Sequence, residues 1–181
     1  MNPCIDILLV EDDPGDVRLA LAVFQKLQLA ERCVVVNDGE EAIDYLCSSG
    51  RFSLRTPGLP RLVLLDLKMP RMNGFDLLER IKTDAALKLI PVVALTSSRE
   101  ERDVDRAYDL GVNGYVVKGI DFKDYQATLR ALAMYWSDIN ERPPGFLERR
   151  RVAAIRSAAK VERRRAVATI LNPWLWPVCR C

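Results

Sequence analysis

The amino-acid sequence predicts an α/β protein with a doubly wound, five-stranded parallel sheet covered by five helices. Two observations predict this fold class. Short and almost wholly apolar segments recur along residues 1–142, as strands buried on both faces require. Longer segments with apolar residues at helical spacing separate them, so strands and helices alternate. We expect one domain over residues 1–142, because this length supplies a single hydrophobic core.

The first strand and helix are predicted within residues 5–27. Residues 5–10 are apolar except for Asp6 and predict a buried strand. Asp13 is a favourable N-cap for the next helix, and Pro14 fits the first helical position because its missing N–H is not needed there. The apolar face of this helix consists of Val17, Ala20, Val23, Phe24 and Leu27.

The second strand is predicted over residues 33–36. Asp38 with Glu41 resembles a capping box, which indicates that a helix begins here. A long loop rich in Ser, Gly, Pro and Arg follows over residues 48–60. The helix between the second strand and this loop is expected to bury Ala42, Ile43 and Leu46.

The remaining strands are predicted over residues 62–66, 91–95 and 114–117. A polar helix over residues 100–110 separates the last two, and the final helix begins near Asp121. The helix after the third strand is expected to turn Phe75, Leu78 and Ile81 inward. The expected inward face of the final helix contains Phe122, Tyr125, Leu129, Leu132, Ala133 and Trp136.

Polar residues stand at the carboxyl ends of four predicted strands. They are Glu11, Asp12 and Asp13 after the first strand, Asp66 at the third, Thr96, Ser97 and Ser98 at the fourth, and Lys118 after the fifth. Because the carboxyl ends of parallel strands meet at one edge of the sheet, these side chains are expected to converge. Each alone has a simpler explanation as an N-cap, turn or solvated residue, but their ordered combination favours a site.

Clustered carboxylates raise one another's pKa unless a cation neutralises them, and Mg²⁺ prefers such oxygen ligands. Beside this ion, Asp66 is expected to attack a phosphoryl group as a nucleophile and form an acyl phosphate. Phosphoryl transfer needs mainly positioning and neutralisation of the phosphoryl oxygens. The Thr96 hydroxyl and the Lys118 ammonium are suited to contact those oxygens.

Four motifs, LLVEDD, LLDLKMPRMNG, ALTSS and GYVVK, resemble in order and separation the receiver domain of two-component response regulators. The resemblance covers roughly residues 4 to 140. It implies a flavodoxin-like sheet with strand order 2-1-3-4-5. It also implies roles for seven residues: Asp66 as phosphoacceptor, Glu11, Asp12, Asp66 and the main-chain carbonyl of Lys68 as Mg²⁺ ligands, Thr96 and Lys118 as phosphoryl contacts, and Tyr115 as the switch residue.

In the receiver family the aromatic switch ring turns inward when the threonine hydroxyl moves toward the phosphate. For Tyr115, the simpler alternative is a half-buried strand tyrosine. Three features depart from the family pattern. Glu11 stands where Asp is commoner, which suggests contact with the metal through water, or Asp13 as the nearer ligand if the strand register slips by one. Gly119 replaces the usual Pro, and the loop over residues 48–60 is unusually long.

The stretches EDDPGDVRL and NDGEEAIDYL, the long loop and the Tyr135–Trp136 pair are similar to single-domain regulators partnered with bacterial phytochrome kinases. This resemblance implies a sensor histidine kinase as partner, with a bacterial phytochrome as the candidate. It also implies a homodimer formed through the fourth helix, fifth strand and fifth helix. Ordinary core packing is the alternative explanation for part of the aromatic face on the last helix.

The chain contains no histidine, which excludes a Ser/His/Asp triad, a Cys/His pair, histidine-ligated zinc and a phosphohistidine on this polypeptide. The kinase must therefore be another protein. Five scattered cysteines form no evident disulfide framework, and no apolar run reaches the roughly 18 residues of a membrane span. A cytoplasmic location is expected.

A basic tail, residues 143–181, follows the acidic body. The chain carries +2 in total and residues 146–181 carry +7, so residues 1–145 carry −5. The tail is expected to be disordered or to form a lone helix. If it is functional, an alternative is a receiver-gated effector that binds DNA or a membrane. A metal-dependent phosphohydrolase is disfavoured because Lys68 stands where a second aspartate would serve as acid and base. We therefore expect that the protein is not an enzyme and catalyses only its own phosphorylation and dephosphorylation.

Overall fold

The computed structural model describes residues 7–55, 58–119 and 121–141. The beginning of the first predicted strand and the whole basic tail lie outside these residues. Among the described helices, none has the length and apolar character needed to span a membrane.

The sheet has the predicted architecture. Its strands are β1 (Ile7–Val10), β2 (Cys33–Val36), β3 (Leu62–Leu65), β4 (Val92–Thr96) and β5 (Gly114–Val117). They lie in the order β2-β1-β3-β4-β5, and all neighbours are parallel. This confirms the flavodoxin-like fold. Two boundaries differ from the prediction, since β3 ends at Leu65 and β4 begins at Val92 and extends to Thr96.

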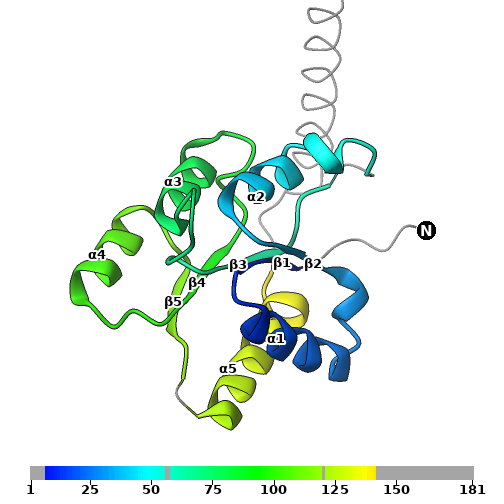
Figure 1. Cartoon of the computed structure of the whole chain (residues 1–181), viewed down its shortest axis with the longest axis vertical. Helices are drawn as coiled ribbons and strands as arrows, with labels where there is room; N and C mark the ends of the chain where they lie inside the picture. The colour runs from blue at the N-terminus through cyan, green and yellow to red at the C-terminus, as the bar shows by residue number, and fades with distance from the viewer. Residues whose placement is uncertain (1–6, 56–57, 120, 142–181) are drawn as a thin grey trace, which may run out of the picture.

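Five helices cover the sheet. They are α1 (Pro14–Lys26), α2 (Gly39–Leu46), α3 (Gly74–Thr83), α4 (Glu101–Asp109) and α5 (Phe122–Met134). Figure 1 shows α1 and α5 together on one side of the sheet, while α2 and α3 lie on the other. A π-helical turn, Tyr135–Ile139, continues α5, and short 3₁₀ turns precede β2 and follow α2.

The strand residues alternate between two apolar cores. In β1, Leu8 and Val10 belong to the core beneath α2, α3 and α4, whereas Ile7 and Leu9 belong to the core beneath α1 and α5. This two-residue period follows from the pleat of an extended strand. Both faces are buried because helices cover both, which explains why the strands read as continuous apolar runs.

The predicted inward face of α5 is partly wrong. Tyr125, Leu129 and Ala133 are buried, but the Phe122 side chain is 60% exposed. Phe122 lies at the correct helical spacing, yet it is the first residue of α5, and Figure 1 shows this end of the helix away from the sheet. Helical spacing defines a face, but a face is buried only where another element lies against it.

The predicted helix caps are present, with one change of partner. Asp13 Oδ1 accepts the N–H groups of Gly15 and Asp16 at 2.7 and 2.9 Å. Asp38 Oδ1 accepts the Glu41 N–H at 2.8 Å, as a capping box requires. The return bond differs, because Glu41 Oε2 accepts the N–H of Asn37, at 3.1 Å, instead of that of Asp38.

Candidate functional site

Main-chain hydrogen bonds fix the residues that follow the strands. The Glu11 N–H donates to the Val36 carbonyl at 3.0 Å, and the Asp66 N–H donates to the Val10 carbonyl at 2.9 Å. The Lys118 N–H likewise donates to the Thr96 carbonyl at 2.8 Å. The sheet ladder thus continues one residue beyond three strands and holds these residues at its carboxyl edge.

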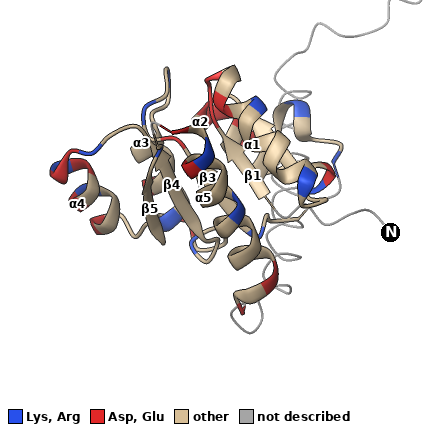
Figure 2. Cartoon of the chain, turned by 90° about the horizontal axis from the view of Figure 1, so that it is seen from below, with Lys and Arg blue, Asp and Glu red and all other residues tan. Residues whose placement is uncertain are grey.

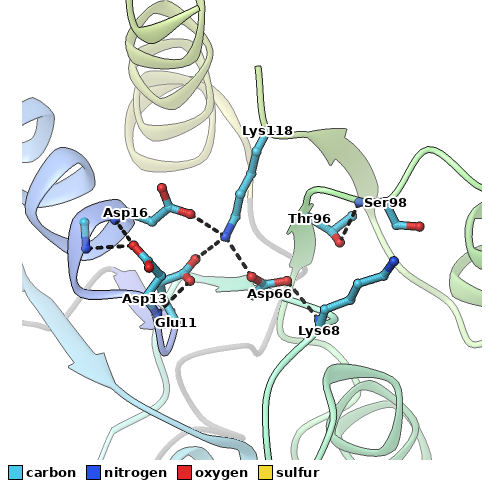
Figure 3. Close-up of polar contacts among 9 residues, drawn as sticks. Glu11, Asp13, Asp16, Asp66, Lys68, Thr96, Ser98 and Lys118 are labelled. Carbon is cyan, nitrogen blue, oxygen red and sulfur yellow. Dashed lines mark hydrogen bonds and ion pairs between the residues drawn. The ribbon is translucent and has the colours of Figure 1, made fainter. Parts of the chain in front are cut away.

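The Lys118 ammonium lies at the centre of this edge (Figure 3). Its Nζ atom lies 2.7 Å from each of three carboxylate oxygens: Glu11 Oε2, Asp16 Oδ2 and Asp66 Oδ2. The Lys118 side chain is only 12% exposed, and Glu11 and Asp66 are buried. The predicted convergence of the first, third and fifth strand ends is therefore present, with Asp16 as an additional member.

Burial and charge act in opposite directions in this cluster. Burial raises the pKa of Glu11 to about 7, although the hydrogen bond and charge of Lys118 pull it down. Burial also disfavours the charged Lys118, but its hydrogen bonds with Asp16, Asp66 and Glu11 outweigh this effect and raise the lysine pKa above its ordinary value. The ammonium consequently remains charged at neutral pH.

The segment after β3 surrounds Asp66 from the other side. The Lys68 N–H donates to Asp66 Oδ1 at 2.9 Å, so each carboxylate oxygen has a partner. Gly74, the first residue of α3, allows the helix to approach this segment. A Cβ atom at Gly74 would lie 2.5 Å from Leu67 Cα and would also collide with the Asp66 carbonyl oxygen. The sequence therefore needs glycine here to bring α3 against the end of β3.

Three carboxylates form a group suited to a hard cation. Glu11, Asp12 and Asp66 each offer one oxygen, and these oxygens lie within 4.8 Å of one another. Asp12 is exposed, so its carboxylate is open to solvent. Asp13, the alternative ligand, instead uses Oδ1 to cap α1. The donor set fits Mg²⁺, which favours carboxylate oxygens together with water.

A second set of contacts links Thr96 to Tyr115 through Ser98. Thr96 is fully buried, and its Oγ1 accepts the Ser98 N–H at 3.2 Å. The Tyr115 hydroxyl donates to the Ser98 carbonyl at 3.2 Å, while its ring packs against the core beneath α2, α3 and α4. Figure 3 shows Thr96 and Ser98 on the opposite side of Asp66 from Glu11. The partial burial of Tyr115 is what a half-buried strand tyrosine would show, and it is also compatible with a switch role.

Sequence reasoning missed three charged residues near this edge. Asp16 contacts Lys118, and Asp103 Oδ2 accepts the Ser98 hydroxyl at 2.6 Å. Arg71 forms an ion pair with the buried Asp38 and thus ties the segment after β3 to α2. Only Asp16 carried a usable signal, because it lies in the first turn of the helix that begins directly after Glu11, Asp12 and Asp13.

The family comparison agrees with this architecture. The model of the response regulator receiver domain matches residues 7–130. The probable methanogenesis regulatory protein FilR2 of Methanothrix harundinacea is 39% identical over 140 residues, which cover 76% of this chain and 86% of FilR2. Response regulator Rcp1 of Synechocystis is 37% identical over 135 residues, which cover 75% of this chain and 90% of Rcp1. The chain belongs to the response regulator receiver domain family of two-component signalling.

Solved structures place phytochrome-associated regulators among the relatives. The phosphorylated cyanobacterial phytochrome response regulator RcpA matches with a TM-score of 0.72 and 34% identity, covering 78% of this chain and 99% of RcpA. The Mn²⁺-bound form of Rcp1 matches with a TM-score of 0.70 and 35% identity, covering 76% and 97%. The bacteriophytochrome response regulator AtBRR matches with a TM-score of 0.61 and 46% identity, covering 77% and 99%.

Proposed function

We propose that this response regulator accepts a phosphoryl group on Asp66 from a partner histidine kinase and then changes a protein-interaction face. One observation carries the proposal. Asp66 lies in contact with the Lys118 ammonium and within 4.8 Å, oxygen to oxygen, of Glu11 and Asp12. A nucleophilic carboxylate, a cation and two metal-binding acids thus share one sheet edge, which is the arrangement that positioned phosphoryl transfer needs.

The proposed transfer begins when an Asp66 oxygen attacks the phosphorus of a phosphohistidine. The phosphorus–nitrogen bond breaks, the released imidazole nitrogen takes a proton, and Asp66 becomes an acyl phosphate. The Lys118 ammonium and the Thr96 hydroxyl donate hydrogen bonds to the phosphoryl oxygens. Glu11, Asp12, Asp66 and the main-chain carbonyl of Lys68 would hold Mg²⁺, which supplies neutralisation of the phosphoryl charge. The Mn²⁺ bound by Rcp1 supports a divalent ion at such an acidic site.

Signal output is proposed to pass through Ser98. The Thr96 hydroxyl and the Tyr115 hydroxyl both bond to main-chain atoms of Ser98, at 3.2 Å each. Movement of Thr96 toward a phosphoryl oxygen would remove the first bond and shift the segment that holds the second. Tyr115 then turns further inward, which changes the surface beside β5 and α4.

The partners are proposed from chemistry and from the relatives. A histidine kinase must be a separate chain because this one contains no histidine. The phytochrome-associated regulators RcpA and AtBRR support a bacterial phytochrome kinase acting in the cytoplasm. A homodimer through α4, β5 and α5 is supported by exposed apolar side chains on the two helices. These side chains are Tyr108 on α4 and Phe122 and Met134 on α5.

The basic tail supports a second candidate function. Residues 146–181 contain nine Lys or Arg against two Glu, whereas Figure 2 shows acidic residues gathered near α1, α2 and the end of α4. Such a tail is suited to bind DNA or an acidic membrane under control of the receiver. Salt-dependent retention on DNA or on anionic vesicles that is lost when residues 146–181 are deleted would support this function.

The primary test uses acetyl phosphate with Mg²⁺, followed by mass spectrometry of the intact protein and its peptides. We expect a hydroxylamine-labile phosphoryl adduct on Asp66 of the wild type and none on Asp66→Asn. Asp105→Asn, which removes an exposed carboxylate on α4, is the matched control and should be phosphorylated normally. Labelling of Asp66→Asn to the wild-type level would refute the proposal. Turnover of small phosphate esters by the wild type would instead indicate a phosphohydrolase.

A further inference from the structure

Asp16 has a distinctive relation to Lys118. A lysine ammonium has three N–H donors. Nζ of Lys118 uses them on three carboxylates, each at 2.7 Å. Two of these acceptors, Glu11 and Asp66, belong to the group of oxygens suited to a metal ion, but Asp16 does not. Asp16 is therefore the one acceptor of Lys118 that is not also proposed to bind the metal ion or the phosphoryl group.

We propose that Asp16 is a positioning residue that keeps the Lys118 ammonium directed at Asp66 during phosphorylation. The inference rests on the proposed function of Asp66. When Glu11 and Asp66 oxygens are drawn to a divalent ion and a phosphoryl group, their hydrogen bonds with Lys118 are shared or lost. The hydrogen bond that Lys118 donates to Asp16 remains, and it holds the ammonium close enough to donate to a phosphoryl oxygen.

Asp16 is well placed for this role because α1 fixes its backbone. Its N–H donates to the N-cap carboxylate of Asp13 at 2.9 Å, and it lies in the first turn of the helix. The Asp16 side chain is 33% exposed, so it lies at the rim of the cluster, whereas Glu11 lies at its base. A carboxylate on a rigid helix defines the lysine position better than one on a loop.

The backbone after Lys118 gives the side chain little independent support. Gly119 follows directly, where the receiver pattern has proline. A Cβ atom at Gly119 would meet only ordinary contacts, of 3.5 Å and longer, so packing does not require glycine here. Glycine also leaves the backbone freer than proline would. The main-chain bond from Lys118 to Thr96 fixes where the side chain starts, and the carboxylates fix where it ends.

A solvated ion pair is the competing explanation. Exposed ion pairs contribute little to stability, and on this explanation the partly exposed Asp16 carboxylate has no role in phosphorylation. The two explanations differ in what the substitution changes. A solvated pair affects neither phosphoryl binding nor transfer, whereas a positioning residue affects both and leaves the separate metal ligands in place.

The test compares Asp16→Asn, Asp16→Glu and Asp105→Asn with the wild type. Phosphorylation by acetyl phosphate is measured over a range of Mg²⁺ and donor concentrations. Beryllofluoride, an analogue of the phosphoryl group, is titrated at saturating Mg²⁺ by NMR, and Mg²⁺ affinity is titrated alone. Melting curves without Mg²⁺ establish that each variant is folded, and Asp16→Ser replaces Asp16→Asn if the latter does not fold.

We expect Asp16→Asn to lower the maximal phosphorylation rate and the beryllofluoride affinity by about tenfold. This is the effect expected when a charge-assisted hydrogen-bond network loses one of its charged acceptors. Mg²⁺ affinity should change less than about threefold, since Asp16 is not a ligand. Asp16→Glu should recover part of the loss, and Asp105→Asn should match the wild type. Unchanged rate and analogue affinity in folded Asp16→Asn, or a loss of Mg²⁺ affinity in equal proportion, would overturn the inference. A wild type that takes no phosphoryl group on Asp66 would refute the proposed function itself and, with it, this role.

Discussion

The Lys118 Nζ atom lies 2.7 Å from Asp66 Oδ2, although the two residues are 52 positions apart in the chain. Both are held by main-chain bonds to neighbouring strands, so the contact belongs to the sheet and does not depend on a flexible loop. Phosphoryl transfer rewards such fixed positioning, because the protein contributes mainly geometry and charge.

Lys118→Met should destabilise the protein in the absence of Mg²⁺. The substitution leaves Glu11, Asp16 and Asp66 without their shared cation. Breaking a fully buried ion pair costs about 3–5 kcal/mol, and we expect about 1–3 kcal/mol here because the cluster retains some solvent contact. Urea unfolding with EDTA measures the loss. Added Mg²⁺ should narrow the difference from the wild type, since it supplies the missing charge, and equal stability in EDTA would contradict the prediction.

Gly74→Ala should separate α3 from the end of β3. The new Cβ would lie 2.5 Å from Leu67 Cα, and the backbone must shift to relieve this contact. Overpacking of this kind costs about 1–3 kcal/mol, which exceeds the helix propensity gained by alanine. Phosphorylation of Asp66 should slow as well, because the displaced segment carries the Lys68 N–H that holds its carboxylate. Gly119→Ala is the control, since its Cβ meets only ordinary contacts, and equal unfolding midpoints for the two variants would disprove the packing argument.

Asp38 should tolerate asparagine better than alanine. Its Oδ1 caps α2 through the Glu41 N–H, and its Oδ2 pairs with Arg71, whose side chain is 65% exposed. Asp38→Ala removes the cap and should cost about 1–2 kcal/mol. Asp38→Asn keeps a capping oxygen and loses mainly the ion pair of the buried Asp38 with Arg71. This pair is worth about 1 kcal/mol, because solvent screens the exposed guanidinium. Chemical denaturation distinguishes them, and a larger loss for asparagine would show that the charge matters more than the cap.

Lys82 should make stability depend on pH in the alkaline range. Burial lowers its pKa from 10.5 to about 8, although Nζ donates to the Ile90 carbonyl and to Asn113 Oδ1. Below pH 8 both the folded and unfolded chains carry the proton. Between about pH 8 and 10.5 the unfolded chain binds more protons, so the folded state gains relative stability as the pH rises.

The stability difference between the wild type and Lys82→Met should therefore rise by about 1–3 kcal/mol from pH 8 to 10.5 in favour of the wild type. Urea denaturation at a series of pH values in this range measures it. A difference that stays constant, or that moves in favour of Lys82→Met, would show that the folded state does not lower the pKa of Lys82.

The sequence by itself determined the fold and the edge at which the site lies. Continuous apolar runs such as Leu62–Leu65 indicate strands covered on both faces, and alternation with helices dictates a parallel sheet. The carboxyl ends of such strands meet, so Glu11, Asp66 and Lys118 were predictable neighbours. These features follow from local backbone periodicity and from the connection rules of βα units, which a single sequence contains.

Only the tertiary structure decided which side chains touch. The sequence did not reveal that Asp16 shares the Lys118 ammonium or that Arg71 reaches Asp38, because both contacts join elements whose distance depends on packing. It also misplaced Phe122, whose helical face extends beyond the sheet that would cover it. Periodicity specifies the direction of a side chain from its own helix or strand, whereas a contact of 2.7 Å requires the second element to lie at the right depth and angle.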